Sequence, residues 1–238
     1  MSPRASVVIP VYNEAESIEA VLLRLLESTT TVHEINVVYD FPEDTTKPLL
    51  ERLSKDYPLI KPVMNTYGRG PANAIKYGID HSQEQIVVVT MADGCDDPNQ
   101  IDSLVKLVDR GVVVACASRY ARSGQQVGGP LVKSFASRLA GVSLYWLARV
   151  GTRDATNSFK AYSRGFVSSV GIESKYGFEI GIEMVSKARR HRQPVAEIPT
   201  IWLDRTLGES NFKLLAWLLH YLRWYVYAFG RRKTFDQK

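Results

Sequence analysis

The sequence contains little cysteine and little histidine. Two cysteines, Cys95 and Cys116, and four histidines occur among 238 residues. Two cysteines cannot build the disulfide framework of a small secreted domain, and no group of cysteines and histidines has the spacing of a zinc site. Both cysteines lie in or just after predicted strands, so we expect free thiols and a reducing compartment.

The chain also lacks a long, uninterrupted apolar run. Residues 1–4 lead directly into a predicted strand, so we expect no cleaved signal peptide. The most apolar stretch, residues 213–229, is interrupted by His220 and Arg223, whereas a membrane-spanning helix needs roughly 20 mostly apolar residues. We therefore expect that this stretch does not cross a membrane.

Neither sign of charge dominates. The formal net charge of +5 and the pI of about 9.1 suit an anionic partner such as a phosphate, a lipid headgroup or a nucleic acid. Nucleic acid is disfavoured, because outside the last predicted helix the basic residues are not interleaved with exposed aromatic platforms. A hydrophobic content of 45% predicts a folded chain with a substantial core.

Predicted strands and helices alternate through the first half, which favours an α/β fold with a doubly wound, mostly parallel sheet and helices on both faces. The predicted strands are residues 6–11, 35–39, 60–63, 86–90 and 112–116, and the helices between them are 15–28, 45–56, 71–79 and 98–110. Further on, we expect helices at 131–148 and 177–190, a loop that enters a strand within 154–162, and an extended segment at 195–203. Residues 1–210 are expected to form one domain, and 211–238 an amphipathic, basic C-terminal helix and tail.

Acidic residues follow three of the predicted strands. Glu14, Asp40 and Asp93 come just after the strands at 6–11, 35–39 and 86–90. The carboxyl ends of parallel strands share one edge of a sheet, where ligands and hard cations bind. We expect these acids to lie together, with Asp93 the first candidate for catalysis.

Two loop patterns lie near this edge. Tyr12 and Glu14 would suit a nucleobase and its ribose, while Asn13 is interpreted as the cap of the helix that begins near residue 15. The segment 68–74 opens a helix with two glycines and a proline, which leaves amide hydrogens available to an anion.

Five segments, in this order, resemble the family 2 glycosyltransferases, whose fold is called GT-A. They are 8–14 (VIPVYNE), 68–78 (GRGPANAIKYG), 117–120 (ASRY), 154–162 (DATNSFKAY) and 204–210 (DRTLGES). The resemblance extends over nearly the whole chain and is strongest to the dolichyl-phosphate mannose synthase group of polyprenyl-phosphate glycosyltransferases.

The resemblance implies a pocket for the nucleotide of a nucleotide diphosphate sugar. It would be lined by Pro10, Tyr12, Glu14 and Asp40, with Arg205 facing the donor phosphates. A transfer with inversion requires that charge on the leaving diphosphate be neutralised.

The same resemblance implies which residues bind the metal ion and the acceptor phosphate. Asp93 would be the second acid of an Asp-x-Asp pair that binds Mg²⁺ or Mn²⁺, and Arg119, Lys133 and Ser137 would hold the acceptor phosphate. Asp93 and Arg119 are thus the catalytic candidates. A phosphate monoester is already anionic near neutral pH, so it needs no strong general base.

The chain departs from the family pattern at the metal site. Met91 stands where the first acid of the pair is expected, and Cys95 where another polar contact often lies. Phosphate oxygens and water can complete the coordination, so Asp93, helped by Asp96 or Asp97, could suffice. Asp96 and Asp97 also precede a predicted helix, where acids are favoured by its dipole. A second departure is 39–44 (YDFPED), which replaces the usual Asp-Asp-Gly-Ser.

The C-terminal helix is predicted to be an interfacial anchor. Its Leu, Trp and Phe side chains and the basic residues 231–233 suit the headgroup region of a membrane. The alternative is that it packs against the catalytic domain or against a helix of a membrane protein or of a second copy.

We therefore expect a glycosyltransferase, peripheral at the cytoplasmic face of a membrane, that moves a hexose to a polyprenyl phosphate of the dolichyl or undecaprenyl type. Two alternatives remain: a family 2 enzyme with a soluble sugar or cell-wall precursor as acceptor, and a non-catalytic nucleotide-sugar-binding subunit, suggested by Met91. The base, guanine or uracil, and the sugar stay open.

Overall fold

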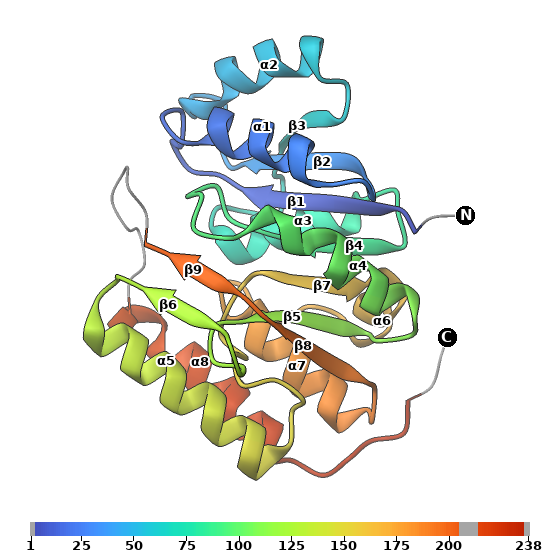
Figure 1. Cartoon of the computed structure of the whole chain (residues 1–238), viewed down its shortest axis with the longest axis vertical. Helices are drawn as coiled ribbons and strands as arrows, with labels where there is room; N and C mark the ends of the chain where they lie inside the picture. Colours follow the sequence, from blue (N-terminus) through green and yellow to red (C-terminus); the bar gives the residue numbers. More distant parts are fainter. Residues whose placement is uncertain (1–2, 205–213, 236–238) are drawn as a thin grey trace.

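The structure, a computed structural model, describes residues 3–204 and 214–235, and for residues 131–133 and 214–216 it describes the backbone alone. Its centre is a seven-stranded sheet with the order β3-β2-β1-β4-β7-β5-β8 (Figure 1). The strands are β1 (Ala5–Pro10), β2 (Val32–Tyr39), β3 (Ile60–Met64), β4 (Ile86–Val89), β5 (Val114–Ser118), β7 (Lys160–Ser163) and β8 (Val195–Pro199). Every pair is parallel except the two that involve β7, which confirms the mostly parallel sheet.

Helices cover both faces of this sheet, as expected for a doubly wound fold. The helices are α1 (Ile18–Ser28), α2 (Thr46–Asp56), α3 (Pro71–Asp80), α4 (Ile101–Asp109), α5 (Leu131–Ser143), α6 (Arg164–Val170), α7 (Ile180–Arg190) and α8 (Leu214–Ala228), with short turns η1 (Pro98–Gln100) and η2 (Leu144–Ala148). One buried cluster joins the sheet to α1, α2 and α4, and a second joins its other face to α3, η2, α6, α7 and α8.

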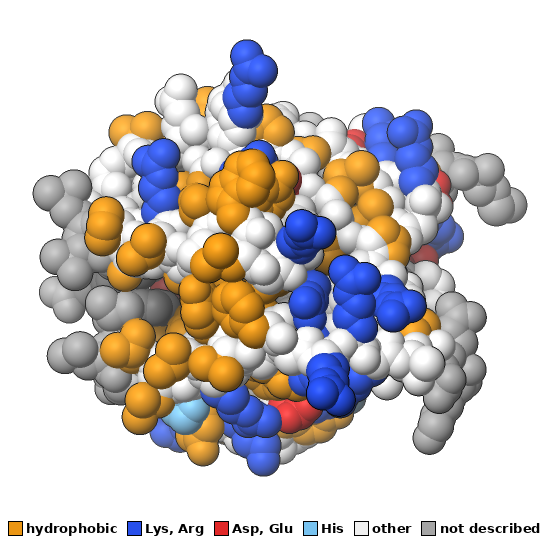
Figure 2. Space-filling view, turned by 90° about the horizontal axis from the view of Figure 1, so that it is seen from below, with side chains coloured by type: hydrophobic (Ala, Val, Ile, Leu, Met, Phe, Trp, Pro, Cys, Tyr) orange, Lys and Arg blue, Asp and Glu red, His pale blue; other side chains and the backbone are white. Residues whose placement is uncertain are grey.

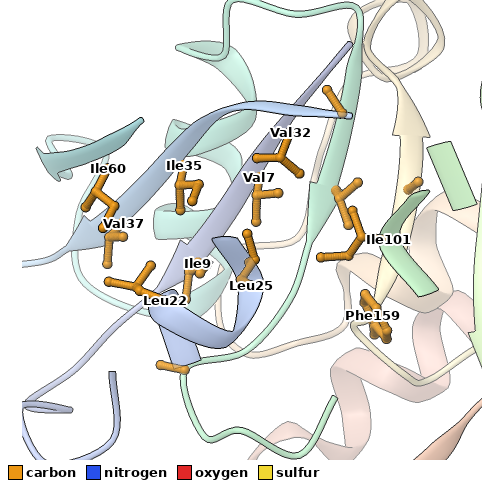
Figure 3. Packing of buried hydrophobic residues seen from close by; sticks show 14 of the residues in the cluster. Val7, Ile9, Leu22, Leu25, Val32, Ile35, Val37, Ile60, Ile101 and Phe159 are labelled. Atoms are coloured by element: carbon orange, nitrogen blue, oxygen red, sulfur yellow. The ribbon is translucent and has the colours of Figure 1, made fainter. Parts of the chain in front are cut away.

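The apolar run of β1 explains its central place. Val7 and Ile9 pack in the cluster that contains Leu22 and Leu25 of α1 (Figure 3), whereas Val8 belongs to the cluster on the other face. All of β1 is buried, as is typical of a parallel strand covered on both sides. Each fully buried aliphatic side chain contributes roughly 1.5–3 kcal/mol.

The antiparallel strand β7 lies between β4 and β5. Val89 at the end of β4 is in register with Lys160 at the start of β7, and Cys116 of β5 faces the same residue. Because β7 runs in the opposite direction, its beginning lies at the edge where the parallel strands end. The loop 152–159, which precedes β7, is thereby brought beside the loops that follow β4 and β5.

Several elements differ from the sequence-based expectations. The extended segment 195–203 breaks at Thr200, so that β8 joins the main sheet and β9 (Ile201–Leu203) pairs in parallel with a short strand, β6 (Gln125–Val127). Neither β6 nor α6 was predicted, since three and seven residues carry too little periodicity. Both cysteines are buried, and neither forms a disulfide.

The last helix, α8, packs against the protein along one side. Trp224 is buried, and its indole Nε1 donates to the hydroxyl of Ser174 at 3.1 Å. Arg223 pairs with Glu173 at 2.7 Å, and the ring of His220 stacks on Tyr176 at 4.0 Å. His220, Arg223 and Trp224 thus contact the segment 173–176, with Trp224 buried and the Arg223 side chain 60% exposed. None of the helices within the described ranges is long and apolar enough to cross a membrane.

Candidate active site

A cavity of about 730 Å³ lies at the carboxyl ends of β1, β2, β4 and β5 and is bounded by α5 and α8. It confirms that the three predicted acids, Glu14, Asp40 and Asp93, share one edge of the sheet. The candidate residues that line it are Pro10, Tyr12, Glu14, Asp40, Asp93, Arg119 and Ser137. Arg205 lies outside the described residues, and Lys133 is on the first turn of α5, where only the backbone is described.

At one end of the cavity, Asp40 joins two loops. Its carboxylate accepts hydrogen bonds from Nδ2 of Asn65 at 2.8 Å and from the main-chain N–H of Gly70 at 2.7 Å. Gly70 has φ of 120°, a conformation that glycine adopts without a steric penalty. Asp40 therefore holds the start of α3 against the end of β2, and its charge faces the cavity from a fixed position.

Aromatic and basic side chains lie beside Asp40. The exposed ring of Tyr12 meets Phe41 edge to face at 5.5 Å, and the guanidinium of Arg69 lies 5.0 Å from the centre of the Phe41 ring. Tyr12 and Arg69 both line the cavity. A flat ligand with anionic groups, such as a nucleotide, would find here both an aromatic surface and a cation.

The prediction that Asn13 caps a helix is wrong. Asn13 has φ of 54°, and α1 begins only at Ile18. Instead, the side-chain oxygen of Asn13 accepts a hydrogen bond from the N–H of Thr45 at 3.1 Å, and its own N–H donates to Asp44 at 3.2 Å. Asn13 thus ties the loop after β1 to the loop after β2, which fixes the neighbouring Tyr12 and Glu14.

Two carboxylates approach one another after β4. Asp93 accepts a hydrogen bond from the N–H of Cys95 at 3.1 Å. Asp96 is buried and accepts from the hydroxyl of Thr90 at 2.9 Å and the N–H of Met91 at 3.3 Å. Burial, followed by the nearby charge of Asp93, raises the pKa of Asp96 to about 7. Both carboxylates line the cavity.

The helix-terminus interpretation thus holds for only one acid of the Asp96–Asp97 pair. Asp97 is the cap of η1 and accepts from the N–H of Asn99 at 3.2 Å. Asp96 instead points back to the end of β4. Its burial beside Asp93 could not be read from two adjacent acids before a proline.

The donor set suits a hard cation. Asp93 and Asp96 offer carboxylate oxygens, which Mg²⁺ and Mn²⁺ prefer, whereas the thioether of Met91 is a poor ligand for either ion. Within the described residues, no group of three or more His, Cys, Asp or Glu side chains could hold a metal ion. A cation would therefore share its coordination with phosphate oxygens of a ligand and with water.

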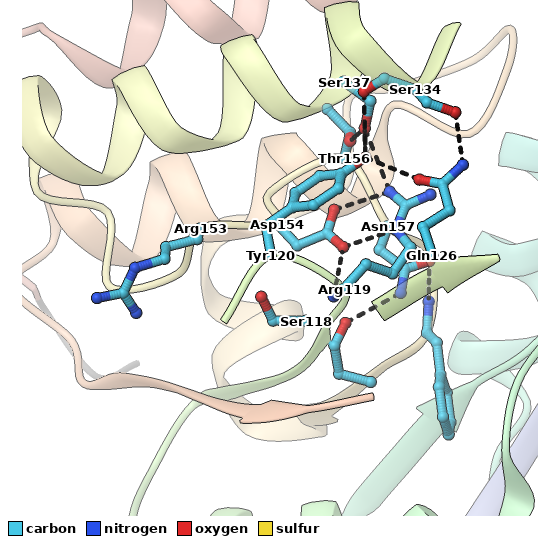
Figure 4. A network of polar contacts seen from close by, with 12 residues as sticks. Ser118, Arg119, Tyr120, Gln126, Ser134, Ser137, Arg153, Asp154, Thr156 and Asn157 are labelled. Carbon is cyan, nitrogen blue, oxygen red and sulfur yellow. Dashed lines mark hydrogen bonds and ion pairs between the residues drawn. The ribbon is translucent and has the colours of Figure 1, made fainter. Parts of the chain in front are cut away.

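At the other end, Arg119 is held by Asp154 (Figure 4). Nε and Nη2 of Arg119 donate to the two carboxylate oxygens at 2.7 and 2.8 Å, and the N–H of Arg119 donates to the same carboxylate at 2.9 Å. Burial alone would lower the pKa of Arg119, but the charge of Asp154 outweighs it and raises the pKa above its ordinary value. Burial likewise opposes ionisation of Asp154, yet Arg119 holds the pKa of Asp154 below normal.

Hydroxyl groups surround this ion pair. Ser137 of α5 accepts from Nη2 of Arg119 at 3.2 Å and contacts the hydroxyl of Thr156 at 2.6 Å. The hydroxyl of Tyr120 donates to Ser137 at 3.1 Å (Figure 4). Three separate segments, the loop after β5, helix α5 and the loop before β7, thus meet at Arg119. The predicted neighbours Arg119 and Ser137 are in direct contact.

Some residues of the cavity were not anticipated. Thr156, Asn157, Trp202 and Tyr221 line it, whereas Asp96, which also lines it, had been named as a helper of Asp93. Asp154 and Thr156 fall in a segment that matched the family pattern, so the motif gave a signal for this loop but no role for either side chain. Trp202 and Tyr221 come from β9 and α8, and no local pattern connects them with Asp93.

Comparison with known proteins agrees with this geometry. Residues 6–171 match the family described as Glycosyl transferase family 2. The chain is 29% identical to a dolichol-phosphate mannosyltransferase of Pyrococcus furiosus over 88% of its own length and 59% of that protein. It is also 29% identical to a polyprenol monophosphomannose synthase of Mycolicibacterium smegmatis, over 90% of its own length and 86% of that protein.

Solved structures share the fold. A glucosyl-3-phosphoglycerate synthase from Mycobacterium tuberculosis, solved with Mn²⁺, UDP and phosphoglyceric acid, aligns with a TM-score of 0.68 at 16% identity over 97% of this chain and 80% of that chain. A mannosyltransferase from Pyrobaculum calidifontis, in complex with GDP-Man and Mn²⁺, aligns with a TM-score of 0.64 at 20% identity, over 98% of this chain and 66% of that chain. The family match covers residues 6–171, and the sheet and the acids at its edge agree with it. The chain therefore belongs to glycosyl transferase family 2 and is a glycosyltransferase of GT-A fold.

Proposed function

We propose that this glycosyltransferase moves a hexose from a nucleotide diphosphate sugar to a polyprenyl phosphate, with inversion at the sugar and with the help of Mg²⁺ or Mn²⁺. The observation that carries the proposal is the course of the cavity. It extends from Asp40 and Asp93 past Arg119 to the space between α5 and α8. A nucleotide sugar fits the first part, and the last part is bounded by helices whose outer surfaces are apolar.

Those outer surfaces form one apolar face, made of exposed side chains of α5, η2, α8 and the residue that follows α8. Its members are Phe135, Leu139, Trp146, Leu147, Leu218, Leu219, Leu222, Val226 and Phe229. Figure 2 looks onto this side of the molecule and shows hydrophobic side chains gathered there, with Lys and Arg side chains beside them. A contiguous apolar face of this kind is typical of an interaction site rather than of ordinary surface.

The apolar face favours a membrane as its partner. Arg138 on α5 and Arg149, which directly follows η2, are exposed. Residues 231–233 are also exposed and basic. Basic groups beside an apolar helix face attract anionic lipid headgroups. On α8, the apolar residues Leu218, Leu219, Leu222 and Val226 are each at least half exposed, so they are presented outwards. We propose that the protein is peripheral at the cytoplasmic face of a membrane.

In the proposed reaction, a phosphate oxygen of the lipid attacks the anomeric carbon of the sugar while the bond to the nucleoside diphosphate breaks. The attacking phosphate is anionic, so no side chain has to remove a proton. Arg119 would donate to that phosphate beside Ser137, with Lys133 as a further cation. Pro10, Tyr12, Glu14 and Asp40 would hold the nucleotide, and Arg205 would face its phosphates.

Asp93 and Asp96 are the carboxylates that would hold a cation at the diphosphate. A bound divalent cation would neutralise charge that develops on the leaving group. The protein fixes both carboxylates in advance, because Cys95 donates to Asp93 and Thr90 to Asp96.

The names of the two relatives support a lipid acceptor, since dolichol and polyprenol are isoprenoid lipids. The soluble acceptor remains the second candidate, because the enzyme from Mycobacterium tuberculosis was solved with phosphoglyceric acid. That likeness shows the fold alone, so the acceptor needs a direct test.

The test has two stages with the full chain. First, a panel of UDP- and GDP-sugars with Mn²⁺ or Mg²⁺ is screened for a rise in melting temperature, because a ligand that binds only the folded state stabilises it. Second, the stabilising donor is incubated with a polyprenyl phosphate in micelles or with 3-phosphoglycerate. We expect transfer to the lipid only. Transfer to 3-phosphoglycerate alone would establish the soluble alternative, and donor binding without any transfer would support a non-catalytic subunit.

A further inference from the structure

The ion pair between Arg119 and Asp154 is unusual in its position. It lies at the wall of the cavity, where Asp154 is fully buried and only 11% of the Arg119 side chain is exposed. A buried ion pair is often no more stabilising than well-packed apolar residues of similar volume. Stability alone therefore gives no reason for this pair at this place.

The pair determines which nitrogens of Arg119 are available to a ligand. Nε and one N–H of Nη2 donate to Asp154, and Nη2 also donates to Ser137. Within the described part of the chain, no group accepts a hydrogen bond from Nη1. One edge of the guanidinium is thus occupied, and the Nη1 end is left to an anion in the cavity.

Asp154 itself is held in place by contacts of its main chain with Thr152 and Lys160. The N–H of Asp154 donates to the hydroxyl of Thr152 at 3.1 Å. The ammonium group of the buried Lys160 donates to the main-chain oxygens of Asp154 and Ala155 at 3.3 Å, and to that of Asn157. The loop that carries Asp154 is therefore anchored to β7, and it can hold Arg119 without moving itself.

We propose that Asp154 is a positioning residue of the transfer reaction: by accepting two guanidinium hydrogen bonds, it presets Arg119 so that Nη1 meets a phosphate oxygen at the reacting end. This inference rests on the proposed function. Donors that are aligned before the reaction stabilise developing charge without a cost of reorganisation. Asp154 also cancels the charge of Arg119, so that the phosphate is oriented more than it is attracted.

This arrangement predicts that Asp154→Asn lowers kcat much more than it changes the KM for the acceptor. The variant keeps a side chain of the same shape but loses the charge and one acceptor, which frees Arg119 to turn. We expect kcat to fall by roughly tenfold or more, because small misplacements of a reacting group are costly. The apparent KM for a short-chain polyprenyl phosphate in micelles should change by less than about threefold, since Arg119 keeps its charge. The Kd of the donor nucleotide should not change.

The chain contains a matched control. Glu197 accepts from the main-chain N–H of Arg153 at 2.7 Å and pairs with the Arg153 side chain, just as Asp154 does with Arg119. Arg153 points away from the network in Figure 4, and neither of these two residues lines the cavity. Glu197→Gln should lower the melting temperature but keep kcat within about twofold of the wild type.

A double-mutant cycle decides whether Asp154 acts through Arg119. Arg119→Gln lowers kcat by itself, and adding Asp154→Asn should then cause little further loss. If Asp154→Asn does not fold, Asp154→Glu replaces it, because it keeps the charge but moves the carboxylate by one methylene. We expect Asp154→Glu to fold and to lose kcat.

The inference is overturned if a folded Asp154 variant keeps the kcat of the wild type, if its loss equals that of Glu197→Gln, or if the loss is undiminished in the Arg119→Gln background. These outcomes require that the wild type transfers sugar to the lipid. Absence of transfer by the wild type would instead contradict the proposed function itself, so the two failures are distinguishable.

Discussion

The main-chain N–H of Gly70 donates to the carboxylate of Asp40 at 2.7 Å, which joins the start of α3 to the end of β2. The same carboxylate accepts from Asn65, so two loops depend on one side chain. The carboxylate of Asp40 therefore both joins these loops and lines the cavity.

Replacing Asp40 with Ala should weaken donor binding on the order of tenfold, because hydrogen bonds to a charged group are each worth about 1.5–3 kcal/mol and the loop 65–70 would lose its anchor. Isothermal titration with the donor measures this change. Glu43→Ala is the control, since it removes an exposed charge from the same loop. Equal loss in both variants would show that Asp40 has no special role.

Asp93→Asn should lower turnover by at least roughly tenfold and leave the melting temperature nearly unchanged, because it removes a metal-binding charge but keeps a similar shape. Steady-state kinetics at saturating donor provides the measurement. Asp97→Asn serves as control, since Asn caps a helix as well as Asp and Asp97 does not line the cavity. Wild-type turnover of folded Asp93→Asn would remove Asp93 from the catalytic candidates.

The reciprocal change is Met91→Asp. Met91 lines the cavity beside Asp93, so an added carboxylate should increase the affinity for Mn²⁺ in the presence of donor. We expect the Mn²⁺ concentration for half-maximal activity to fall several-fold, together with the Kd from direct Mn²⁺ titration. No change in either quantity would mean that the coordination is completed without this position.

Asp96→Asn should change how stability depends on pH in metal-free protein. Burial first, and then the charge of Asp93, raise the pKa of Asp96 to about 7. A raised acid pKa favours folding when the group is protonated, and this contribution is lost as the pH rises through about 7. Asn does not ionise, so the variant should gain stability relative to the wild type as the pH rises from about 4 to about 7, and no more above that. Urea unfolding in chelator at several pH values measures the difference, and a constant difference would contradict the prediction.

Changing Leu219, Leu222 and Val226 together to Gln should abolish sedimentation with anionic vesicles and leave the fold intact. These residues lie on the outer side of α8, and Leu219 is 73% exposed. Met64→Gln is the control, because Met64 is an exposed apolar residue on β3, far from α8 in Figure 1. Substitution is preferred to deletion of α8, which would remove the buried Trp224 and uncover α7. Vesicle binding by the triple variant would show that another surface contacts the membrane.

The sequence predicted the edge of the sheet well, because strand ends are local features. Glu14, Asp40 and Asp93 each follow an apolar run, and parallel order then brings them together. Local reasoning was wrong for Asn13, whose partner Thr45 is supplied by the next loop and not by the helix that follows it.

Contacts between residues far apart in the sequence could not be predicted, because short sequence patterns carry only local information. Arg119 and Asp154 are separated by 35 residues, and only the reversed direction of β7 places them side by side. Nothing in a short pattern of charges distinguishes Asp96, which points into the protein, from Asp97, which caps a turn. The amphipathic character of α8 was visible, but which of its sides meets the protein depends on Glu173, Ser174 and Tyr176.

The insertion of β7 between β4 and β5 also has a consequence for folding. Pairing of Ile86 with Ser163 closes a long segment of chain, and such non-local contacts form late because their loop-closure entropy must first be overcome. A nascent chain that has not yet exposed residues 160–163 can pair β1, β2, β3 and β4, but it lacks the strand that separates β4 from β5. The loops of Asp93 and Arg119 would then stand at a different spacing, so catalytic competence should arise in one late step and not grow gradually with the sheet.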